Sequence, residues 1–291
     1  MARCLVTGHR GYIGSKLFKK LKLLGHEAIG IDLNEDIPKD INKTLVEDTD
    51  GKFHPYYVNF QPEYIFHMAC LPRVGYSVEH PVLTTRNNIL AGTNILNFAR
   101  KVGSVKRVIY SSSSSVVGNG NGPASPYALQ KYTTELETTM YSHLYGLDTV
   151  SLRYFNVYSH DQRADGPYAT AVANWMRSIR EGTNPYITGD GNQRRDMVNV
   201  EDVVAANIFC MNYGEPLNGA VFDVGTGDNI SLNEISEIVK THFPNSAFDH
   251  VEPRKGDVLM TRADTTGLAE LGWNAKVTIN KGISDCFGRL K

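Results

Sequence analysis

The chain has 291 residues, of which 41% are hydrophobic and 21% are charged, an ordinary globular composition with enough length for a sizeable core. Its 30 Lys and Arg nearly balance 31 Asp and Glu, for a formal net charge of -1, which indicates neither a nucleic-acid partner nor an anionic membrane surface. No apolar run approaches the roughly 20 residues of a membrane span, and no signal peptide precedes the first apolar run. We therefore expect a cytoplasmic protein.

The cysteines give no sign of a disulfide framework or a metal site. They are scattered without C-x-x-C spacing, and each lies in an apolar stretch that suits a small buried thiol: Cys4, Cys70, Cys210 and Cys286. We therefore expect reduced, structural cysteines and no bound metal.

The first half of the chain alternates short β-branched runs with longer helical patterns, which predicts a parallel sheet with helices on both faces. This is the α/β doubly wound fold class. Strands are expected over residues 4–6, 28–32, 64–68, 105–111 and 149–155, the last two as the fifth and sixth of the sheet. Helices are expected over residues 14–24, 87–101 and 127–144, where apolar residues recur at helical spacing.

The pattern becomes less regular after residue 155. We expect a helix over 171–180, a short strand over 184–188, a strand followed by a helix over 198–212, and a strand over 220–224. This irregular half predicts a smaller α/β lobe that is interleaved with the first half.

A glycine loop follows the first expected strand and opens the first helix. Its glycines, Gly8, Gly11 and Gly14, allow a tight turn, and the helix N-terminus offers N–H groups to a pyrophosphate. Asp32 closes the second strand, where a carboxylate can accept hydrogen bonds from ribose hydroxyls and repels a 2′-phosphate. The sequence thus predicts an NAD-binding Rossmann domain over 1–157, with segments near 196–224 returning to it. Residues 158–291 are predicted to form mainly a substrate-binding lobe.

Tyr127 and Lys131 are four residues apart in an expected helix, so their phenol and ammonium share one face. A tyrosine with a pKa of roughly 10 is a poor base at neutral pH, but a fixed cation nearby lowers that pKa. Alone, such a pair is more often a solvated helix face. The serine run 111–115 changes this interpretation, because it ends the expected fifth strand at the sheet edge where ligands of open α/β folds bind.

These motifs resemble the extended short-chain dehydrogenase/reductase family, and in particular its NAD-dependent nucleotide-sugar 4-epimerases. The blocks that carry the resemblance run nearly end to end: residues 7–14, 67–69, 125–131, 152–158, 189–196 and 254–257. In that family the active Ser or Thr is placed relative to a later aromatic-Gly pair. Counting back from Gly118 gives Ser113, with Ser115 as a neighbouring candidate, while Val117 replaces the usual tyrosine.

The resemblance implies a role for each group of residues. The implied catalytic residues are Ser113, Tyr127 and Lys131. The implied contacts to NAD are Gly8, Gly11, Tyr12, Ile13, Gly14, Asp32, Leu33, Asp48, Met68, Ala69, Leu71, Asn87, Tyr127, Lys131 and Phe155. The implied contacts to substrate are Ser113, Ser115, Asn156, Arg195, Arg254, Asp257 and Thr261. Forked arginine donors suit phosphate oxygens, although a surface ion pair is the alternative for either arginine.

The implied reaction is inversion of C4 of a UDP-sugar through a transient 4-keto sugar. A small residue at Thr261 favours UDP-N-acetylglucosamine, with UDP-glucose close behind, although simple packing explains this side chain equally well. Related 4,6-dehydratases carry Asp-Glu after the active hydroxyl residue, where this chain has Ser114 and Ser115. Epimerisation is therefore preferred, and a dehydratase, a decarboxylase and a non-catalytic, NAD-bound regulator remain alternatives.

A homodimer is the expected assembly. The helices over 87–101 and 127–144 carry apolar residues on more than one face, including Tyr141 and Tyr145. Pairing of these helices between two copies would bury them, although core packing explains the same pattern equally well.

Overall fold

The computed structural model describes residues 1–33, 52–72, 74–118, 120–162, 164, 170–253 and 259–290. Three residues expected at the site, Asp48, Arg254 and Asp257, lie outside these ranges. The chain forms two compact units. Unit 1 comprises residues 1–117, 121–153 and 204–222, and unit 2 comprises residues 118–120, 154–203 and 223–291.

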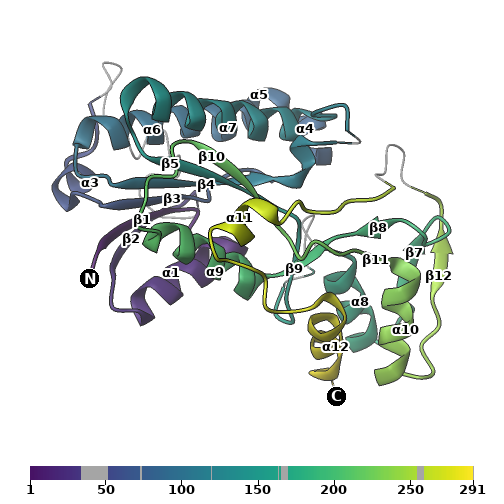
Figure 1. The fold of residues 1–291 in the computed structure, drawn as a ribbon. Helices are drawn as coiled ribbons and strands as arrows, with labels where there is room; N and C mark the ends of the chain where they lie inside the picture. Colours follow the sequence, from purple (N-terminus) through teal and green to yellow (C-terminus); the bar gives the residue numbers. More distant parts are fainter. Residues whose placement is uncertain are drawn as a thin grey trace. The chain divides into compact units, whose positions relative to one another are not determined.

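Unit 1 is built on a six-stranded sheet in the order β10-β5-β4-β3-β1-β2 (Figure 1). Its strands are β1 Arg3–Thr7, β2 Glu27–Ile31, β3 Tyr64–His67, β4 Arg107–Ser113, β5 Thr149–Tyr154 and β10 Ala220–Val224. The pairs β1–β2, β1–β3 and β3–β4 are parallel. The strand that ends in the serine run, expected as the fifth, is therefore β4 among the described strands.

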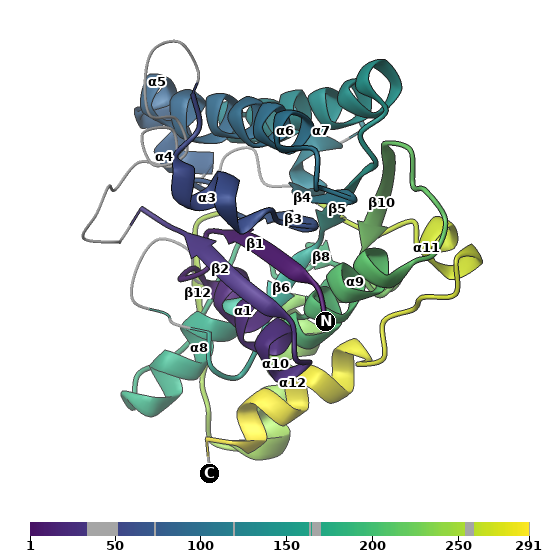
Figure 2. The same cartoon turned by 90° about the vertical axis from the view of Figure 1, so that its left-hand side faces the viewer.

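Helices cover both faces of this sheet. The helices described in unit 1 are α1 Tyr12–Leu23, α3 Pro55–Phe60, α4 Val74–Glu79, α5 Pro81–Thr85, the π-helix η1 Arg86–Leu90, α6 Ala91–Val102, the 3-10 helix η2 Ser114–Val116, α7 Pro126–Tyr145 and α9 Val200–Asn212. The first four residues of α9 belong to unit 2 and the rest to unit 1. Figures 1 and 2 show α6 and α7 on one face and α1 and α9 on the other. The prediction of a doubly wound α/β fold is confirmed.

The core between the sheet and α6 begins with a row of residues in register. Leu5 of β1 pairs with Ile65 of β3, which pairs with Val108 of β4. All three side chains are buried, and they join Ile95 and Phe98 of α6 in one apolar cluster. Because side chains alternate across a strand, one such row supplies a face for the helix to cover.

Unit 2 is a smaller α/β assembly, as expected. Its strands pair two by two: β6 Asn156–Tyr158 with β9 Met197–Asn199, β8 Arg194–Arg195 with β11 Ile230–Ser231, and β7 Tyr186–Thr188 with β12 Asp249–Val251. Its helices among the described residues are α8 Ala171–Arg180, α10 Leu232–His242, α11 Thr266–Glu270 and α12 Ile279–Gly288. Trp175 of α8, Ile235 of α10 and Phe287 of α12 share a buried cluster.

The cysteines are free, and three of them are buried as expected. The prediction of a buried thiol is wrong for Cys70, just beyond β3, which is only half-buried. None of the helices in the described ranges has the length and apolar character of a bilayer span.

Candidate active site

The glycine loop is packed so tightly that two of its glycines have no room for a side chain. Gly8 has φ 69, and a Cβ there would lie 2.9 Å from the Ala69 backbone. At Gly14, a Cβ would lie 2.1 Å from the carbonyl oxygen of Gly8. Gly11 precedes α1 as its N-cap and provides no side-chain cap. The loop therefore presents backbone and a helix N-terminus, the combination that binds a dinucleotide pyrophosphate.

Asp32 lies beside this loop, directly after β2. One of its carboxylate oxygens, Oδ2, accepts a hydrogen bond of 2.8 Å from the Arg10 backbone N–H. The carboxylate is thereby held at the loop, where the sequence argument placed an acceptor for ribose hydroxyls.

The segment after β3 is fixed to the loop and to α7. The Ala69 N–H donates to Thr7 Oγ1 at 3.1 Å, and the Leu71 N–H donates to Asn88 Oδ1 at 2.7 Å. Asn88 Nδ2 in turn donates to Gln130 Oε1 on α7 at 2.7 Å. Sequence reasoning selected Asn87 and missed Asn88, whose side chain holds the expected cofactor-lining segment in place.

His67, the last residue of β3, is neutral. Its Nδ1 lies 2.8 Å from Thr7 Oγ1, and its ring stacks on Tyr110 at 5.7 Å between centroids. Burial, assisted by the charge of Lys131, lowers the pKa of His67 to about 3. The ring therefore supports the strand ends without adding charge.

The serines that end β4 have separate contacts because strand side chains alternate in direction. Ser111 Oγ lies 2.7 Å from Met68 Sδ, and Ser112 Oγ donates to Glu135 Oε2 at 2.6 Å. Ser113 lies close enough to the Tyr127 phenol to lower its pKa, and its hydroxyl accepts from Ser115 Oγ at 2.9 Å. Ser113 is thus the serine that the structure brings to Tyr127.

Helix α7 places Tyr127 and Lys131. It begins with Ser125, whose side chain accepts from the Ala128 N–H, followed by proline at the first helical position. The Lys131 side chain is buried, and its Nζ donates to the Ser111 carbonyl oxygen at 2.6 Å. The structure therefore has Tyr127 and Lys131 one turn apart on a helix that packs next to the serine run, as the sequence predicted.

The electrostatic expectation for Tyr127 needs correction. Burial and the neighbouring Cys70 raise the pKa of the Tyr127 phenol above its ordinary value, and the nearby Ser113 side chain lowers it. Lys131 was expected to lower this pKa. Its Nζ instead donates a hydrogen bond to the Ser111 carbonyl oxygen. Desolvation of the phenolate therefore outweighs the stabilisation by its neighbours.

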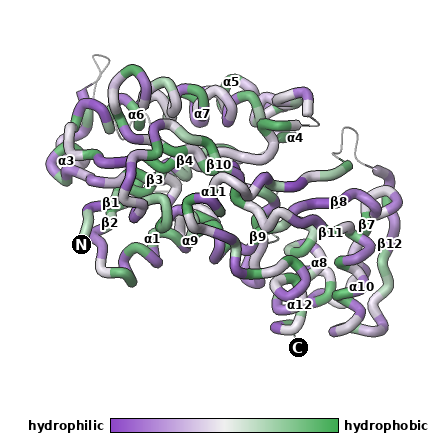
Figure 3. Tube along the Cα trace, viewed as in Figure 1, coloured by the Kyte–Doolittle hydropathy of each residue, from purple (hydrophilic) through white to green (hydrophobic). Residues whose placement is uncertain are grey.

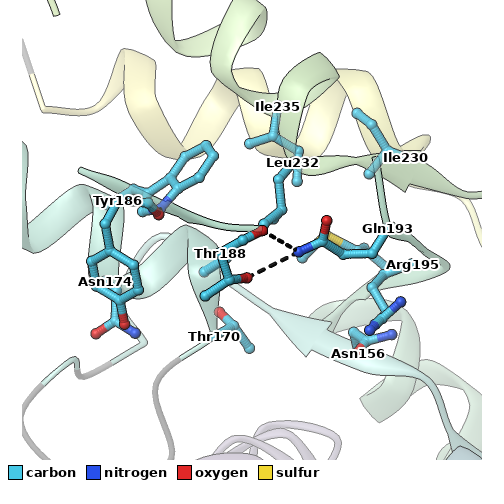
Figure 4. Close-up of a pocket in the computed structure, with 13 residues that line it drawn as sticks. Asn156, Thr170, Asn174, Tyr186, Thr188, Gln193, Arg195, Ile230, Leu232 and Ile235 are labelled. Carbon is cyan, nitrogen blue, oxygen red and sulfur yellow. Dashed lines mark hydrogen bonds between the residues drawn. The ribbon is translucent and has the colours of Figure 1, made fainter. Parts of the chain in front are cut away.

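Unit 2 contains a cavity of about 190 Å³ with polar and apolar walls. Asn156 and Arg195, both expected to bind substrate, lie together at one end of it (Figure 4). Gln193 lies between them and Thr188, to which its Nε2 donates twice at 2.9 Å. Sequence reasoning quoted Gln193 within a family block but assigned it no role.

The two adjacent arginines of β8 differ in their contacts. Arg194 forms an ion pair with Glu234 at 2.8 Å and donates to Asn229 Oδ1. Arg195 instead reaches the cavity and donates to the carbonyl oxygen of Arg194. Arg194 is therefore held in an ion pair, and the Arg195 side chain lines the cavity.

Asp196, a residue that sequence reasoning left unassigned, organises this region from a fully buried position. Its carboxylate accepts hydrogen bonds from the N–H groups of Thr226, Gly227 and Ala263 and from the Thr226 hydroxyl. Its carbonyl oxygen accepts from Asn156 Nδ2 at 2.7 Å, and its N–H donates to Thr261. Asn156 and Thr261, which are 105 residues apart, are thus held at one point.

Phe155, an expected contact of NAD, follows β5 directly. Phe155 is buried, and its N–H donates to the Val224 carbonyl oxygen. The described residues contain no group of three or more His, Cys, Asp or Glu side chains that could hold a metal ion.

Comparison with known proteins agrees with this geometry. The model of the NAD dependent epimerase/dehydratase family matches residues 4–225. A UDP-glucose 4-epimerase of Mycolicibacterium smegmatis is 33% identical over 305 residues, covering 97% of this chain and 96% of that protein.

Two solved structures share the fold over nearly their whole length. UDP-glucose 4-epimerase from Thermotoga maritima, with UDP-glucose, matches at 31% identity with a TM-score of 0.88, covering 99% of this chain and 98% of that chain. UDP-N-acetylglucosamine 4-epimerase from Methanobrevibacter ruminantium M1, in complex with UDP-N-acetylmuramic acid, matches at 27% identity with a TM-score of 0.81, covering 98% and 97%.

Proposed function

This chain belongs to the NAD-dependent epimerase/dehydratase family, and we propose that it inverts C4 of a UDP-sugar, either UDP-N-acetylglucosamine or UDP-glucose. The family's dependence on NAD confirms the cofactor that the glycine loop and Asp32 predicted. The observation that carries the proposal is the placement of Tyr127 close to Ser113, with Lys131 buried one turn along the same helix and bonded to the serine run through the Ser111 carbonyl oxygen.

The proposed chemistry assigns one task to each of these side chains. Tyr127, as phenolate, takes the proton of the sugar 4-hydroxyl, and Ser113 holds the same oxygen through its hydroxyl. Lys131 contributes a fixed positive charge close to the phenol. NAD, when bound, supplies the redox chemistry by taking up and later returning the hydrogen and electron pair of C4.

Inversion follows if the 4-keto sugar rotates in the site before it is reduced, so that it presents the opposite face of C4. Tyr127 then returns its proton to the oxygen as hydrogen is added to the opposite face of C4. The net reaction consumes no oxidant or reductant, so the protein needs no second dinucleotide between cycles.

Binding of NAD is assigned to residues 1–157, with segments near 196–224 returning to this domain. Gly8, Gly11, Tyr12, Ile13 and Gly14 would receive the pyrophosphate, and Asp32 and Leu33 would border the ribose. The remaining proposed contacts are Asp48, Met68, Ala69, Leu71, Asn87, Tyr127, Lys131 and Phe155. The absence of room for a Cβ at Gly8 and Gly14 supports this assignment.

Binding of the substrate is assigned mainly to residues 158–291. The cavity that Asn156 and Arg195 share supports a nucleoside diphosphate site, since a guanidinium provides paired donors for phosphate oxygens. Arg254 and Asp257, outside the described residues, and Ser115 complete the proposed substrate contacts.

Thr261 remains the proposed neighbour of the sugar. A threonine leaves more room than a tyrosine at this position, and one relative of each substrate class is known among the proteins compared above. The hydroxyl of Thr261 accepts from the Asp196 N–H at 3.2 Å, which orients the side chain.

Epimerisation is preferred over 4,6-dehydration on the residues present. Elimination of water across C5 and C6 needs an acid and a base beside the active serine, and Ser114 and Ser115 provide neither. Decarboxylation of a uronic acid remains the alternative that product analysis must separate.

We also propose that a second copy of the chain covers α7. Four large apolar side chains on this helix are between 46% and 64% exposed: Leu129, Leu136, Met140 and Leu144. Their spacing of seven, four and four residues aligns them along one side of the helix. An apolar stripe of this kind is typical of an isologous helix interface.

The function is tested with purified protein and no added NAD. UDP-N-acetylglucosamine, UDP-glucose, UDP-glucuronic acid, and GDP- and dTDP-hexoses are incubated separately, and the products are identified by NMR. We expect the C4 epimer of a UDP-sugar, without loss of water or carbon dioxide. A 4-keto-6-deoxy product, a decarboxylated product, or no turnover of any sugar nucleotide would refute the proposal.

A further inference from the structure

Glu135 is a buried carboxylate that the proposed reaction does not use. It lies on α7 with only 2% of its surface exposed. Oε2 accepts from Ser112 Oγ at 2.6 Å and from Arg153 Nε at 2.9 Å, and Oε1 accepts from Arg153 Nη2 at 2.6 Å. Three donors from β4 and β5 thus converge on one side chain of the helix.

A charge in such a place requires compensation. Removing a carboxylate from water is costly, and the cost is offset only when an opposite charge and further donors meet it with good geometry. The forked guanidinium of Arg153 provides that geometry, and the Ser112 hydroxyl adds a third hydrogen bond. Because apolar packing could join a helix to a sheet without this cost, the ion pair indicates a need for a fixed position.

The position that it fixes is that of the catalytic residues. Glu135 follows Lys131 by four residues and Tyr127 by eight, so all three lie on one face of α7. On β4, Ser112 separates Ser111, whose carbonyl oxygen accepts from Lys131, from Ser113, whose hydroxyl contacts Tyr127. The hydrogen bond to Glu135 therefore holds the strand at the residue between these two contacts.

We propose that Glu135, held by Arg153, is a positioning residue that sets Lys131 and Ser113 at their working distances from Tyr127. The inference rests on the proposed function of that same site. It adds that the three catalytic residues require a further side chain to hold them in position. Glu135 is not among the residues proposed to contact substrate or cofactor.

The principal test is Glu135→Gln, which keeps the shape of the side chain and removes its charge. We expect kcat to fall by about 100-fold, since displacement of a reacting group by about 1 Å has that effect. The KM for the sugar nucleotide, from steady-state kinetics, and the dissociation constant of NAD, from calorimetry, should stay within about twofold of the wild-type values because Glu135 is not a proposed contact of either ligand.

Glu137→Gln is the matched control. Glu137 lies two residues further along α7 and accepts a hydrogen bond from Thr93 Oγ1 at 2.8 Å. This variant also weakens a contact of α7, but the contact lies away from the serine run. Its kcat should remain within about twofold of wild type, whatever the change in thermal stability.

A second variant covers the case in which Glu135→Gln folds poorly. Ser112→Ala removes one hydrogen bond and leaves the ion pair with Arg153 intact, so we expect a folded protein with kcat reduced by about 10-fold. The double variant should lose less than the product of the two single losses, because both act through one contact.

The opposite results would overturn the inference. Unchanged kcat in folded Glu135→Gln, or equal losses in Glu135→Gln and Glu137→Gln, would leave Glu135 a purely structural residue.

Tyr127 can also be observed without turnover, which separates this inference from the proposed function. In protein labelled with 13C-tyrosine, the Tyr127 ring signal, identified by its loss in Tyr127→Phe, reports deprotonation. If Glu135 positions Ser113, then Glu135→Gln loses a contact that favours the phenolate, and Tyr127 should titrate at higher pH. Titration at lower pH, as expected from removal of a negative charge alone, would refute positioning even in a protein that epimerises nothing.

Discussion

Lys131 and Ser111 are joined by a hydrogen bond of 2.6 Å from the lysine Nζ to the main-chain carbonyl oxygen. The ammonium is thus tied to the backbone of β4, one residue before the Glu135 contact and two before Ser113. The same Nζ lies 5.0 Å from the centroid of the Tyr110 ring. The charge near Tyr127 is therefore set in position by the protein itself, which is the condition for electrostatic preorganisation.

Replacement of Tyr127 with phenylalanine removes the proposed base and leaves the shape of the site. We expect kcat to fall by about 1,000-fold or more, because acid–base groups typically contribute 10²–10⁴-fold. Bound NAD, measured after denaturation of the purified protein, should be retained. Tyr132→Phe on the same helix is the control and should behave as wild type. Turnover by Tyr127→Phe at the wild-type rate would exclude Tyr127 as the base.

The pH dependence of turnover should follow the phenol. Burial and Cys70 raise the pKa of Tyr127, so the active phenolate is the minor form at neutral pH and kcat should increase as pH rises above 7. Cys70→Ala removes one of the groups that raise this pKa. The increase in kcat should therefore begin at lower pH in the variant.

Profiles of kcat against pH for the two proteins check this prediction. A flat profile in the wild-type protein would show that deprotonation of a phenol does not limit the rate. A shift to higher pH in Cys70→Ala would show that the effect of the thiol has the wrong sign.

Asp196 should matter to both stability and substrate binding. Asp196→Ala leaves the N–H groups of Thr226, Gly227 and Ala263 without their acceptor. We expect the free energy of unfolding to fall by about 3 kcal/mol, the scale set by unsatisfied buried donors. Because Asn156 and Thr261 bond to the Asp196 backbone, the KM for the sugar nucleotide should also rise.

Urea unfolding and steady-state kinetics measure the two effects. The control is Asp190→Ala, since Asp190 is exposed and its carboxylate accepts hydrogen bonds from the N–H and side chain of its neighbour Asn192. This variant should unfold close to wild type and keep its KM. Equal behaviour of the two variants would deny Asp196 its organising role.

Periodicity and turn chemistry predicted many of the strands and longer helices because both act over short stretches of chain. The strand expected over 220–224 and the helix expected over 171–180 have the bounds found in the structure. Helix α10 was not assigned, although the pair Ser231 and Glu234 forms a capping box with the S-x-x-E spacing. That signal was available in the sequence.

The supporting residues of the site were harder to predict. Tyr127, Lys131 and Ser113 stood out because each fits a known kind of chemistry at a recognisable spacing. Glu135 continues the same four-residue spacing, but its partner Arg153 is 18 residues away on a strand. Likewise, the acceptors and donors that meet at Asp196 come from segments up to 67 residues distant. Such contacts depend on tertiary packing, which local patterns do not encode.

The exposed side of α7 gives the test of assembly. Figure 3 shows hydrophobic and hydrophilic residues alternating along this helix, and its outer stripe includes Leu136 and Met140 at 52% and 46% exposure. If two copies pair here, Leu136→Glu places two like charges in an apolar contact and should convert a dimer into a monomer. Sedimentation velocity measures the change.

Leu23→Glu is the control, because Leu23 is even more exposed, at 72%, but lies on α1, away from the stripe. A wild-type monomer, or a dimer that persists in Leu136→Glu, would refute pairing through α7. Since Tyr127 and Lys131 lie on the same helix, we expect loss of the dimer to lower kcat as well.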